Sequence, residues 1–171
     1  DEVERLGGQI FMSKTGHSHV KNNLKKFNAD LAGEMSGHIF FAKDYYGFDD
    51  AFFAAVKVLE ILDNNDKKLS DLVDEIPRVF NTPEIRIDCD DNKKFDIINK
   101  ITERQKRSKK QITDIDGVRV SEKDGWWLLR ASNTQPAIVL RCESLTEDGL
   151  EFQKRLVKKE LSEFNIDIFE K

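Results

Sequence analysis

Three loops of the sequence concentrate the side chains that can bind a polar ligand. The first, residues 33–38, places a carboxylate, a hydroxyl and an imidazole in one glycine-bounded turn as Glu34, Ser36 and His38. Glycines let the backbone of such a turn approach a ligand closely. A carboxylate accepts hydrogen bonds from neighbouring hydroxyl groups, and Ser and His add donors, so this loop suits a polyol such as a sugar. A polar turn that binds nothing is the alternative interpretation.

The second loop, residues 14–18, reads Lys-Thr-Gly-His-Ser and is expected between a strand and a helix. The start of a helix presents unpaired amides, which attract an anion or a sugar oxygen. An ordinary cap made by a Ser or Thr hydroxyl is the alternative. A zinc site of His17, His19 and Glu34 is not expected, because a His-x-His pair at a helix start points its side chains apart and no cysteine is near. We therefore expect no metal ligands in the chain.

The third loop, residues 130–136, joins two apolar runs. Arg130 offers a planar guanidinium that can bind phosphate through two hydrogen bonds. Ser132, Asn133 and Thr134 add three short polar side chains over a turn, whose backbone amides can also face an anion. The pattern predicts a phosphate-binding loop, although an ordinary hairpin connection would need no more than these residues.

Composition narrows the classes of protein to which the chain can belong. Its 171 residues carry 28 Lys and Arg against 32 Asp and Glu, a formal net charge of −4, which argues against a general binder of nucleic acid or anionic membranes. No apolar run approaches the roughly 18 residues that span a bilayer. Two cysteines, Cys89 and Cys142, indicate free thiols in a reducing compartment. The N-terminus has neither an initiator Met nor signal-peptide features, so we expect a cytoplasmic protein cut from a longer chain.

The elements expected over residues 1–81 alternate between helical and extended segments. Such alternation predicts an α/β layer structure with some parallel strand pairing. A helix is expected to end before Gly7 and Gly8, and another to begin with Asp49 or Asp50 as its cap. The helices that the periodicity predicts cover residues 18–27, 50–62 and 69–73, and the extended segments cover 9–12, 30–32 and 39–42.

The periodicity changes at residues 81–83, where Pro83 forces its predecessor to extend. We place a domain boundary there. The pattern beyond it predicts a small α+β unit over residues 84–171. Its expected elements are a strand at 84–89, a helix at 92–105, three strands near 112–120, 126–131 and 137–142, and a closing helix at 147–164.

With these motifs, the chain resembles the α-D-phosphohexomutase superfamily, specifically its bacterial phosphomannomutase/phosphoglucomutase branch. Residues 33–38, Gly-Glu-Met-Ser-Gly-His, are similar to the family's sugar-recognition loop, and residues 130–136 resemble the phosphate-binding loop of its last domain. Residues 15–18 and 46–50 match the same branch. The resemblance implies that residues 1–81 are the C-terminal part of a three-layer α/β third domain. It also implies that residues 84–171 are a fourth domain, α+β and similar to the TATA-binding protein.

The resemblance also implies an activity, the interconversion of hexose 1-phosphate and hexose 6-phosphate. In the family a phosphoserine transfers its phosphoryl group, glucose or mannose 1,6-bisphosphate is the intermediate, and Mg²⁺ assists. A hinge near residues 81–83 would let the last domain close over the substrate. Glu34, Ser36 and His38 would hold the sugar, and His17 would lie near its reacting end as a substrate or proton-transfer contact. The phosphate would be held by Arg130, Ser132, Asn133 and Thr134.

Two of the family's loops have no counterpart in this sequence. These are the serine loop, of the Thr-Ala-Ser-His-Asn-Pro kind, and the metal loop, of the Asp-Gly-Asp-x-Asp-Arg kind. We therefore expect a C-terminal fragment that recognises hexose phosphates, depends on the missing N-terminal domains of the same chain, and is inactive alone. The alternative is a non-catalytic interaction module whose loops are structural and whose basic run, residues 106–110, binds a partner.

Overall fold

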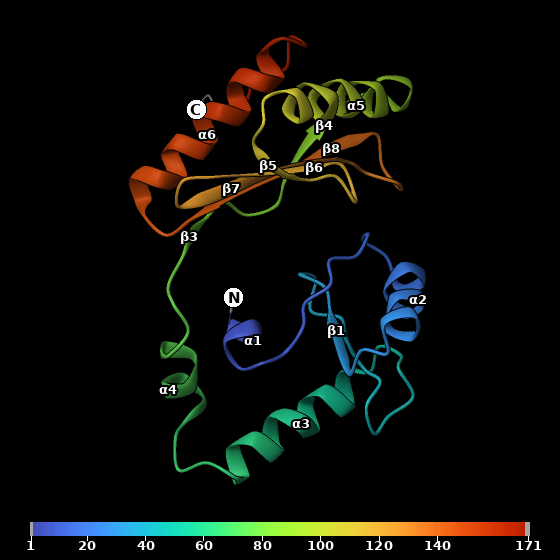
Figure 1. The fold of residues 1–171 in the computed structure, drawn as a ribbon, viewed down its shortest axis with the longest axis vertical. Helices are drawn as coiled ribbons and strands as arrows, with labels where there is room; N and C mark the ends of the chain where they lie inside the picture. The colour runs from blue at the N-terminus through green and yellow to red at the C-terminus, as the bar shows by residue number, and fades with distance from the viewer. Residues whose placement is uncertain (1, 170–171) are drawn as a thin grey trace. The chain divides into compact units, whose positions relative to one another are not determined.

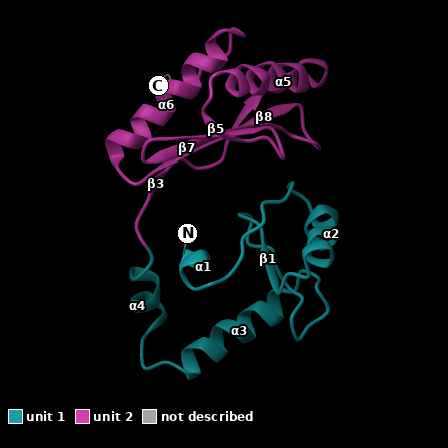
Figure 2. Ribbon diagram, in the orientation of Figure 1, with its two compact units in different colours: residues 1–76 teal, residues 77–171 magenta. Residues whose placement is uncertain are grey.

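The computed structural model describes residues 2–169, which divide into two compact units (Figure 2). Unit 1 comprises residues 1–76 and unit 2 comprises residues 77–171. Among the described residues, no helix combines the length and apolar character that crossing a membrane requires.

The boundary between the two units lies between residues 76 and 77, earlier in the chain than the boundary at residues 81–83 that we expected from Pro83. Strand β3 (Phe80–Asn81) already pairs antiparallel with β8 (Ala137–Ser144) of unit 2. The Thr82 amide then donates to the Cys142 carbonyl at 2.9 Å, and the Cys142 amide donates to the Thr82 hydroxyl at 3.1 Å. These backbone pairings tie the residues before Pro83 to the sheet of unit 2.

Unit 1 contains the helices that the sequence predicts. Asp50 caps one of them, since its side chain accepts a hydrogen bond from the Phe53 amide at 3.0 Å. The prediction of a helix end before Gly7 is also confirmed. The elements are α1 (Glu2–Arg5), α2 (His17–Phe27), β1 (Leu31–Gly33), β2 (Ile39–Phe41), α3 (Ala51–Asp63) and α4 (Leu69–Asp74).

Two strand predictions for unit 1 were wrong. β1 and β2 are joined by the short loop 34–38, which permits only an antiparallel hairpin, and no parallel pair occurs among the described strands. Residues 9–12 are not a strand, because no neighbouring strand in the described part of the chain offers them a ladder. Phe11 of this segment instead stacks on Phe27 of α2, with ring centroids 4.2 Å apart.

The core of unit 1 is small. Val20 and Leu24 of α2 pack with Phe40 of β2, and each of the three is nearly or fully buried. Helix α3 contributes no buried residue, and Phe52 on it is 88% exposed. The apolar periodicity that predicts α3 therefore leaves an uncovered apolar face.

Unit 2 is an antiparallel sheet with two helices, as the α+β prediction requires. The strand order is β3-β8-β7-β6-β5, with β4 also paired to β8. The single strand predicted near 112–120 is two strands, because Gly117 turns the chain with φ of +75°. The remaining elements are β4 (Ile85–Asp88), α5 (Asp91–Arg107), β5 (Gln111–Thr113), β6 (Val118–Glu122), β7 (Gly125–Ala131) and α6 (Glu147–Ser162).

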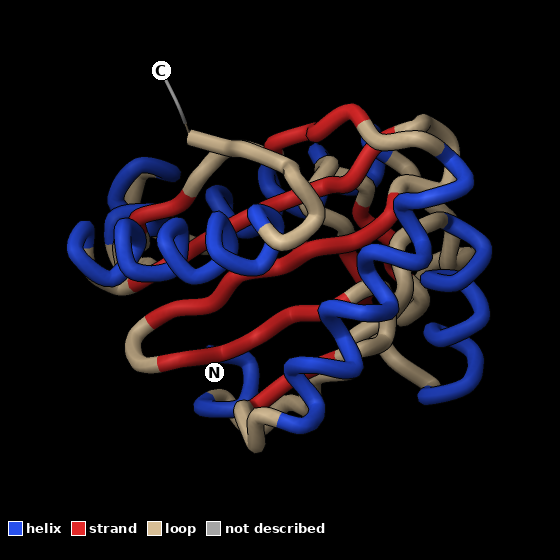
Figure 3. The backbone as a smooth tube through the Cα atoms, turned by 90° about the horizontal axis from the view of Figure 1, so that it is seen from above, coloured by secondary structure: helices blue, strands red, loops and turns tan. Residues whose placement is uncertain are grey.

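Helices α5 and α6 cover one face of this sheet (Figure 1), and Figure 3 views the strands from the side that they cover. Trp127, Leu129 and Ala131 alternate along β7 toward the helices and are buried, as are Leu140 and Cys142 of β8. Burial raises the pKa of the Cys142 thiol to about 12. Unit 2 therefore has one continuous hydrophobic core.

Candidate functional site

The loop between β1 and β2 is closed by its own backbone. The Glu34 amide donates to the His38 carbonyl and the Gly37 amide donates to the Glu34 carbonyl, both at 2.9 Å. Gly37 has φ of +89°, a conformation that favours glycine. Ser36 at the tip is exposed, whereas Glu34 and His38 at its base are partly buried. The three predicted sugar contacts thus come from one rigid turn.

Glu34 links this loop to the start of α2. The Gly16 amide donates to Glu34 Oε1 at 2.8 Å, and His17 Nε2 lies 4.0 Å from Glu34 Oε2. The first two polar loops of the sequence are therefore neighbours in the fold. The anion that the N-terminus of α2 attracts is the protein's own Glu34 carboxylate.

Asp49 completes the cluster and was missed in the sequence. His38 Nδ1 lies 2.5 Å from Asp49 Oδ2, the Ile39 amide donates to Asp49 Oδ1 at 3.2 Å, and His17 Nε2 lies 3.9 Å from Asp49 Oδ2. The sequence offered a signal in the pair of acids before α3, since only one of them can cap the helix. Asp50 does so, and Asp49 is left to hold His38.

The two imidazoles of this cluster are accessible to a ligand. Their ring centroids are 4.6 Å apart, and the side chains of His17 and His38 are 46% and 44% exposed. A carboxylate beside one ring nitrogen orients the ring and leaves the other nitrogen for a ligand. His19, the third histidine, does not belong to the cluster of potential ligand atoms.

A second hydrogen bond supports the segment that leads to Asp49. The Tyr45 hydroxyl donates to Asp50 Oδ2 at 2.6 Å, and the Tyr45 ring stacks on Phe53 with centroids 3.8 Å apart. This bond, with the Phe53 amide, holds the pKa of the Asp50 carboxyl below its usual value, and the same bond raises the pKa of Tyr45. The loop and the helix start are thereby joined.

In unit 2, Ser132 shapes the predicted phosphate loop. Ser132 is buried, and its Oγ accepts hydrogen bonds from the amides of Gln135 at 3.2 Å and Thr134 at 3.4 Å. Those two amides therefore face the serine and not an external anion. The groups that remain for a ligand are the exposed side chains of Asn133 and Thr134, the guanidinium of Arg130, which is 16% exposed, and the hydroxyl proton of Ser132.

Three charged residues around this loop were also missed in the sequence. Lys94 is buried and donates to the Gln135 carbonyl at 2.7 Å. Arg86 hydrogen-bonds the Gln135 side chain and donates to Glu84 Oε1 at 2.6 Å. Arg130 Nη2 lies 4.0 Å from Glu84 Oε2, so one carboxylate stands between two guanidinium groups. Except for the Arg86–Glu84 pair, these contacts join residues far apart in the sequence, which no local pattern reveals.

The basic run 106–110 begins in the last turn of α5, and two of its four basic residues pair with carboxylates. Lys106 Nζ lies 2.9 Å from Asp114 Oδ2 and 3.0 Å from Glu103 Oε1, and both partners raise its pKa. Lys110 Nζ lies 2.8 Å from Glu122 Oε2. Such pairing favours a solvated helix end over a docking patch for an acidic partner.

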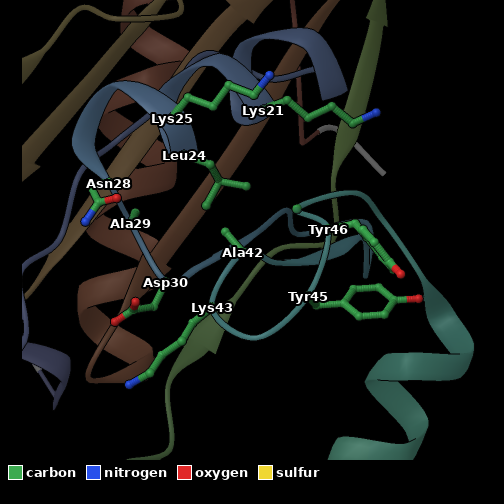
Figure 4. Close-up of a pocket in the computed structure, with 11 residues that line it drawn as sticks. Lys21, Leu24, Lys25, Asn28, Ala29, Asp30, Ala42, Lys43, Tyr45 and Tyr46 are labelled. Atoms are coloured by element: carbon green, nitrogen blue, oxygen red, sulfur yellow. The ribbon is translucent and has the colours of Figure 1, made fainter.

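A pocket in unit 1 lies apart from these loops. It opens between the end of α2 and residues 42–47, with Leu24 and Ala42 as its apolar residues near the centre (Figure 4). None of the predicted site residues lines it.

The described residues do not fit a magnesium site. Their one group of three potential ligands, His17, His38 and Asp49, contains two imidazoles. Mg²⁺ demands oxygen ligands.

Comparison with known families matches nearly the whole chain. Residues 1–80 match the model of phosphoglucomutase/phosphomannomutase alpha/beta/alpha domain III, and residues 84–158 match the model of the C-terminal domain of the same family. The two matches lie on either side of residues 81–83.

Relatives with curated names agree. The chain is 44% identical to a phosphomannomutase/phosphoglucomutase of Pseudomonas syringae, covering 97% of this chain and 36% of that protein. It is 40% identical to a phosphoglucomutase of Neisseria gonorrhoeae, covering 87% of this chain and 33% of that protein. A crystal structure of a phosphoglucomutase/phosphomannomutase family protein from Burkholderia thailandensis superposes with a TM-score of 0.83 at 36% identity, covering 95% of this chain and 34% of that one. The chain thus spans about a third of the length of these relatives.

Proposed function

Because the chain belongs to the phosphoglucomutase/phosphomannomutase family, we propose that it carries the substrate-recognition loops of a phosphohexomutase. The parent reaction would interconvert the 1-phosphates and 6-phosphates of glucose or mannose. One observation carries the proposal: each unit presents one pre-shaped polar loop, a carboxylate-and-imidazole cluster in unit 1 and an arginine-bearing loop in unit 2.

In unit 1 the proposed ligand is the sugar. Glu34 is oriented by the Gly16 amide and accepts hydrogen bonds from ring hydroxyls, and exposed Ser36 donates to them. His38, oriented by Asp49, and His17 present accessible ring nitrogens to the same ligand. His17 would contact the reacting end of the sugar or assist proton transfer there.

In unit 2 the proposed ligand is the phosphate. Arg130 would bind it through two hydrogen bonds, and Asn133 and Thr134 would add donors from their exposed side chains. Ser132 would contribute its hydroxyl proton, because its oxygen already orders the loop. The Glu84 carboxylate lies 4.0 Å from Arg130 Nη2, and a phosphate group bound by Arg130 would replace it as the partner of the guanidinium.

The phosphoryl transfer itself would require the rest of the parent protein. The phosphoserine, the Mg²⁺ site and the chemistry of the 1,6-bisphosphate intermediate would belong to N-terminal domains of the parent protein. The fragment would then bind substrate and be inactive alone. Free thiols at Cys89 and Cys142 agree with a reducing compartment such as the cytoplasm.

Loss of the arginine tests the phosphate half of this proposal. Arg130→Ala is expected to weaken binding of glucose 1-phosphate by about 10- to 100-fold, the equivalent of a charge-assisted hydrogen bond of about 1.5–3 kcal/mol. The dissociation constants would be measured by calorimetry or NMR titration. Arg155→Ala, which removes an exposed arginine from α6, is the matched control and should bind as the parent chain does. Equal affinities of all three proteins would contradict the proposal.

A further inference from the structure

The cluster in unit 1 has the composition of a site for a transition-metal ion. His17, His38 and Asp49 each offer one ligand atom, and the three atoms all lie within 4.8 Å of one another. They come from the start of α2, the base of the β1–β2 loop and the residue before the cap of α3. Three separate segments therefore bring two imidazoles and a carboxylate to one point.

These ligand types select among metal ions. Imidazole nitrogen and carboxylate oxygen are both common ligands of Zn²⁺, and three protein ligands with an open fourth position are typical of accessible zinc sites. Ca²⁺ and Mg²⁺ take oxygen ligands almost exclusively. The side chain of Glu34, with Oε2 4.0 Å from His17 Nε2, adds a second negative charge beside the cluster. The charge and the ligand set together favour Zn²⁺ over the hard divalent ions.

The three ligand atoms lie within 4.8 Å of one another, so zinc binding would draw the side chains of the cluster together. Zinc–ligand bonds of about 2.0 Å in a tetrahedron separate the ligand atoms by about 3.3 Å. The two observed separations lie on either side of that value, at 2.5 Å between His38 Nδ1 and Asp49 Oδ2 and 3.9 Å between His17 Nε2 and Asp49 Oδ2. A neutral His38 that binds Zn²⁺ through Nδ1 carries its ring proton on Nε2, so two bonds to the metal would replace the contact between His38 Nδ1 and Asp49 Oδ2.

The surroundings hold the ligand side chains in place. Asp49 Oδ1 accepts from the Ile39 amide, and Asp49 forms a backbone bridge with Phe40. The His17 ring packs edge-on against the buried Phe40 ring, with centroids 5.2 Å apart. Hydrogen bonds and packing of this kind orient the ligands of protein metal sites.

We propose that His17, His38 and Asp49 form a Zn²⁺ site on the recognition surface of unit 1. This site goes beyond the proposed function, because a metal held by His17 Nε2 and His38 Nδ1 would engage both imidazoles that the proposed function assigns to the sugar and would inhibit substrate binding. Zinc binding is independent of the proposed function, whereas the inhibition rests on it.

Titration of the 171-residue chain with ZnCl₂ tests the site, by calorimetry and by NMR of the imidazole nitrogens. One zinc ion is expected to bind, with the His17 and His38 resonances moving and those of His19 unchanged. His38→Ala and Asp49→Asn should each weaken binding by about tenfold or more. His19→Ala removes a histidine outside the cluster and should bind zinc as the parent chain does.

Amide spectra of each variant would test whether the fold is kept, and in the parent chain the imidazole resonances would report the site without any substitution. Loss of affinity in His19→Ala equal to that in His38→Ala would overturn the proposal. Shifts confined to His19 or to the partly exposed Cys89 would also overturn it. MgCl₂ at the same concentration should leave all three histidines unchanged.

A second titration separates zinc binding from the proposed function. With glucose 1-phosphate present, the apparent dissociation constant for zinc should rise. A zinc dissociation constant that does not change when glucose 1-phosphate is added would support the zinc site and contradict its overlap with the substrate. No zinc binding, with sugar-phosphate binding intact, would overturn the site alone.

Discussion

Unit 2 supports its loop on a continuous hydrophobic core, whereas unit 1 holds its loops mostly by polar contacts. In unit 2 the strand that contains Arg130 also carries Trp127 and Leu129, which are 1% and 0% exposed. In unit 1 the fully or nearly buried apolar residues are Val20, Leu24 and Phe40. The loop geometry there depends on hydrogen bonds such as Gly16 to Glu34 and on the pair of His38 with Asp49.

The difference teaches that a recognition loop needs local order more than a large core beneath it. A backbone-closed turn and a few charge-assisted contacts fix side-chain directions even where burial is slight. Such contacts add little to global stability when exposed. We therefore expect unit 2 to resist unfolding more than unit 1, with both loops retaining their shape under native conditions.

The largest expected effect is on the core of unit 2. Leu129→Ala deletes a fully buried side chain and should lower the free energy of unfolding of unit 2 by about 2–5 kcal/mol. Chemical denaturation followed by tryptophan fluorescence measures it, because Trp126 and Trp127 both lie in β7. The matched change in unit 1, Phe52→Ala, removes a side chain that is 88% exposed and should change the stability of that unit, measured by amide hydrogen exchange, by less than about 0.5 kcal/mol. Comparable losses would contradict the contrast between the units.

A smaller difference in stability between the two units is expected from substitutions at their turn glycines. Both Gly117 and Gly37 have positive φ, but a Cβ at Gly117 would meet the Leu129 carbonyl oxygen at 2.2 Å, whereas one at Gly37 meets no described atom within 4 Å. Gly37→Ala should cost about 1 kcal/mol from backbone strain alone, and Gly117→Ala should cost more. Thermal unfolding of both variants checks the order, and a reversed order would show that unit 1 is the more tightly packed.

The smallest expected effect is on the stability of unit 1 at acidic pH. The Tyr45 hydroxyl and the Phe53 amide hold the pKa of Asp50 below its usual value, so the folded state favours the ionised carboxylate. That stabilisation is complete above the unfolded pKa near 4 and is lost as pH falls through the lower folded pKa. Asp50→Asn should flatten the acid limb of the stability of unit 1, measured by amide hydrogen exchange. An unchanged acid limb would exclude this contribution.

Local patterns predicted much of the fold. Apolar periodicity located α2, α3, α5 and α6. The predictions of a strand at 9–12 and of parallel pairing were wrong. A strand forms only where another strand pairs with it, and such pairing depends on residues distant in the sequence.

For the candidate site, too, the sequence predicted local features and missed contacts between distant residues. Both loops were recognised from residue types within a few positions, but the partners that orient them were not. Asp49 reaches His38 across a hairpin, and Lys94 reaches the Gln135 carbonyl from a helix far away in sequence. Ser132 was expected to bind phosphate, and the structure shows that its oxygen also folds the loop. Side-chain to backbone contacts of this kind depend on the final backbone path.

The most direct test is an amide NMR titration of the described loops with three probes. Glucose should move the resonances of residues 33–38, inorganic phosphate those of residues 132–134, and glucose 1-phosphate both, with affinity in the millimolar range, or about −4 kcal/mol. Glucose 1-phosphate that leaves both loops unmoved, in a chain whose spectrum shows it folded, would contradict the assignment of these loops to substrate recognition.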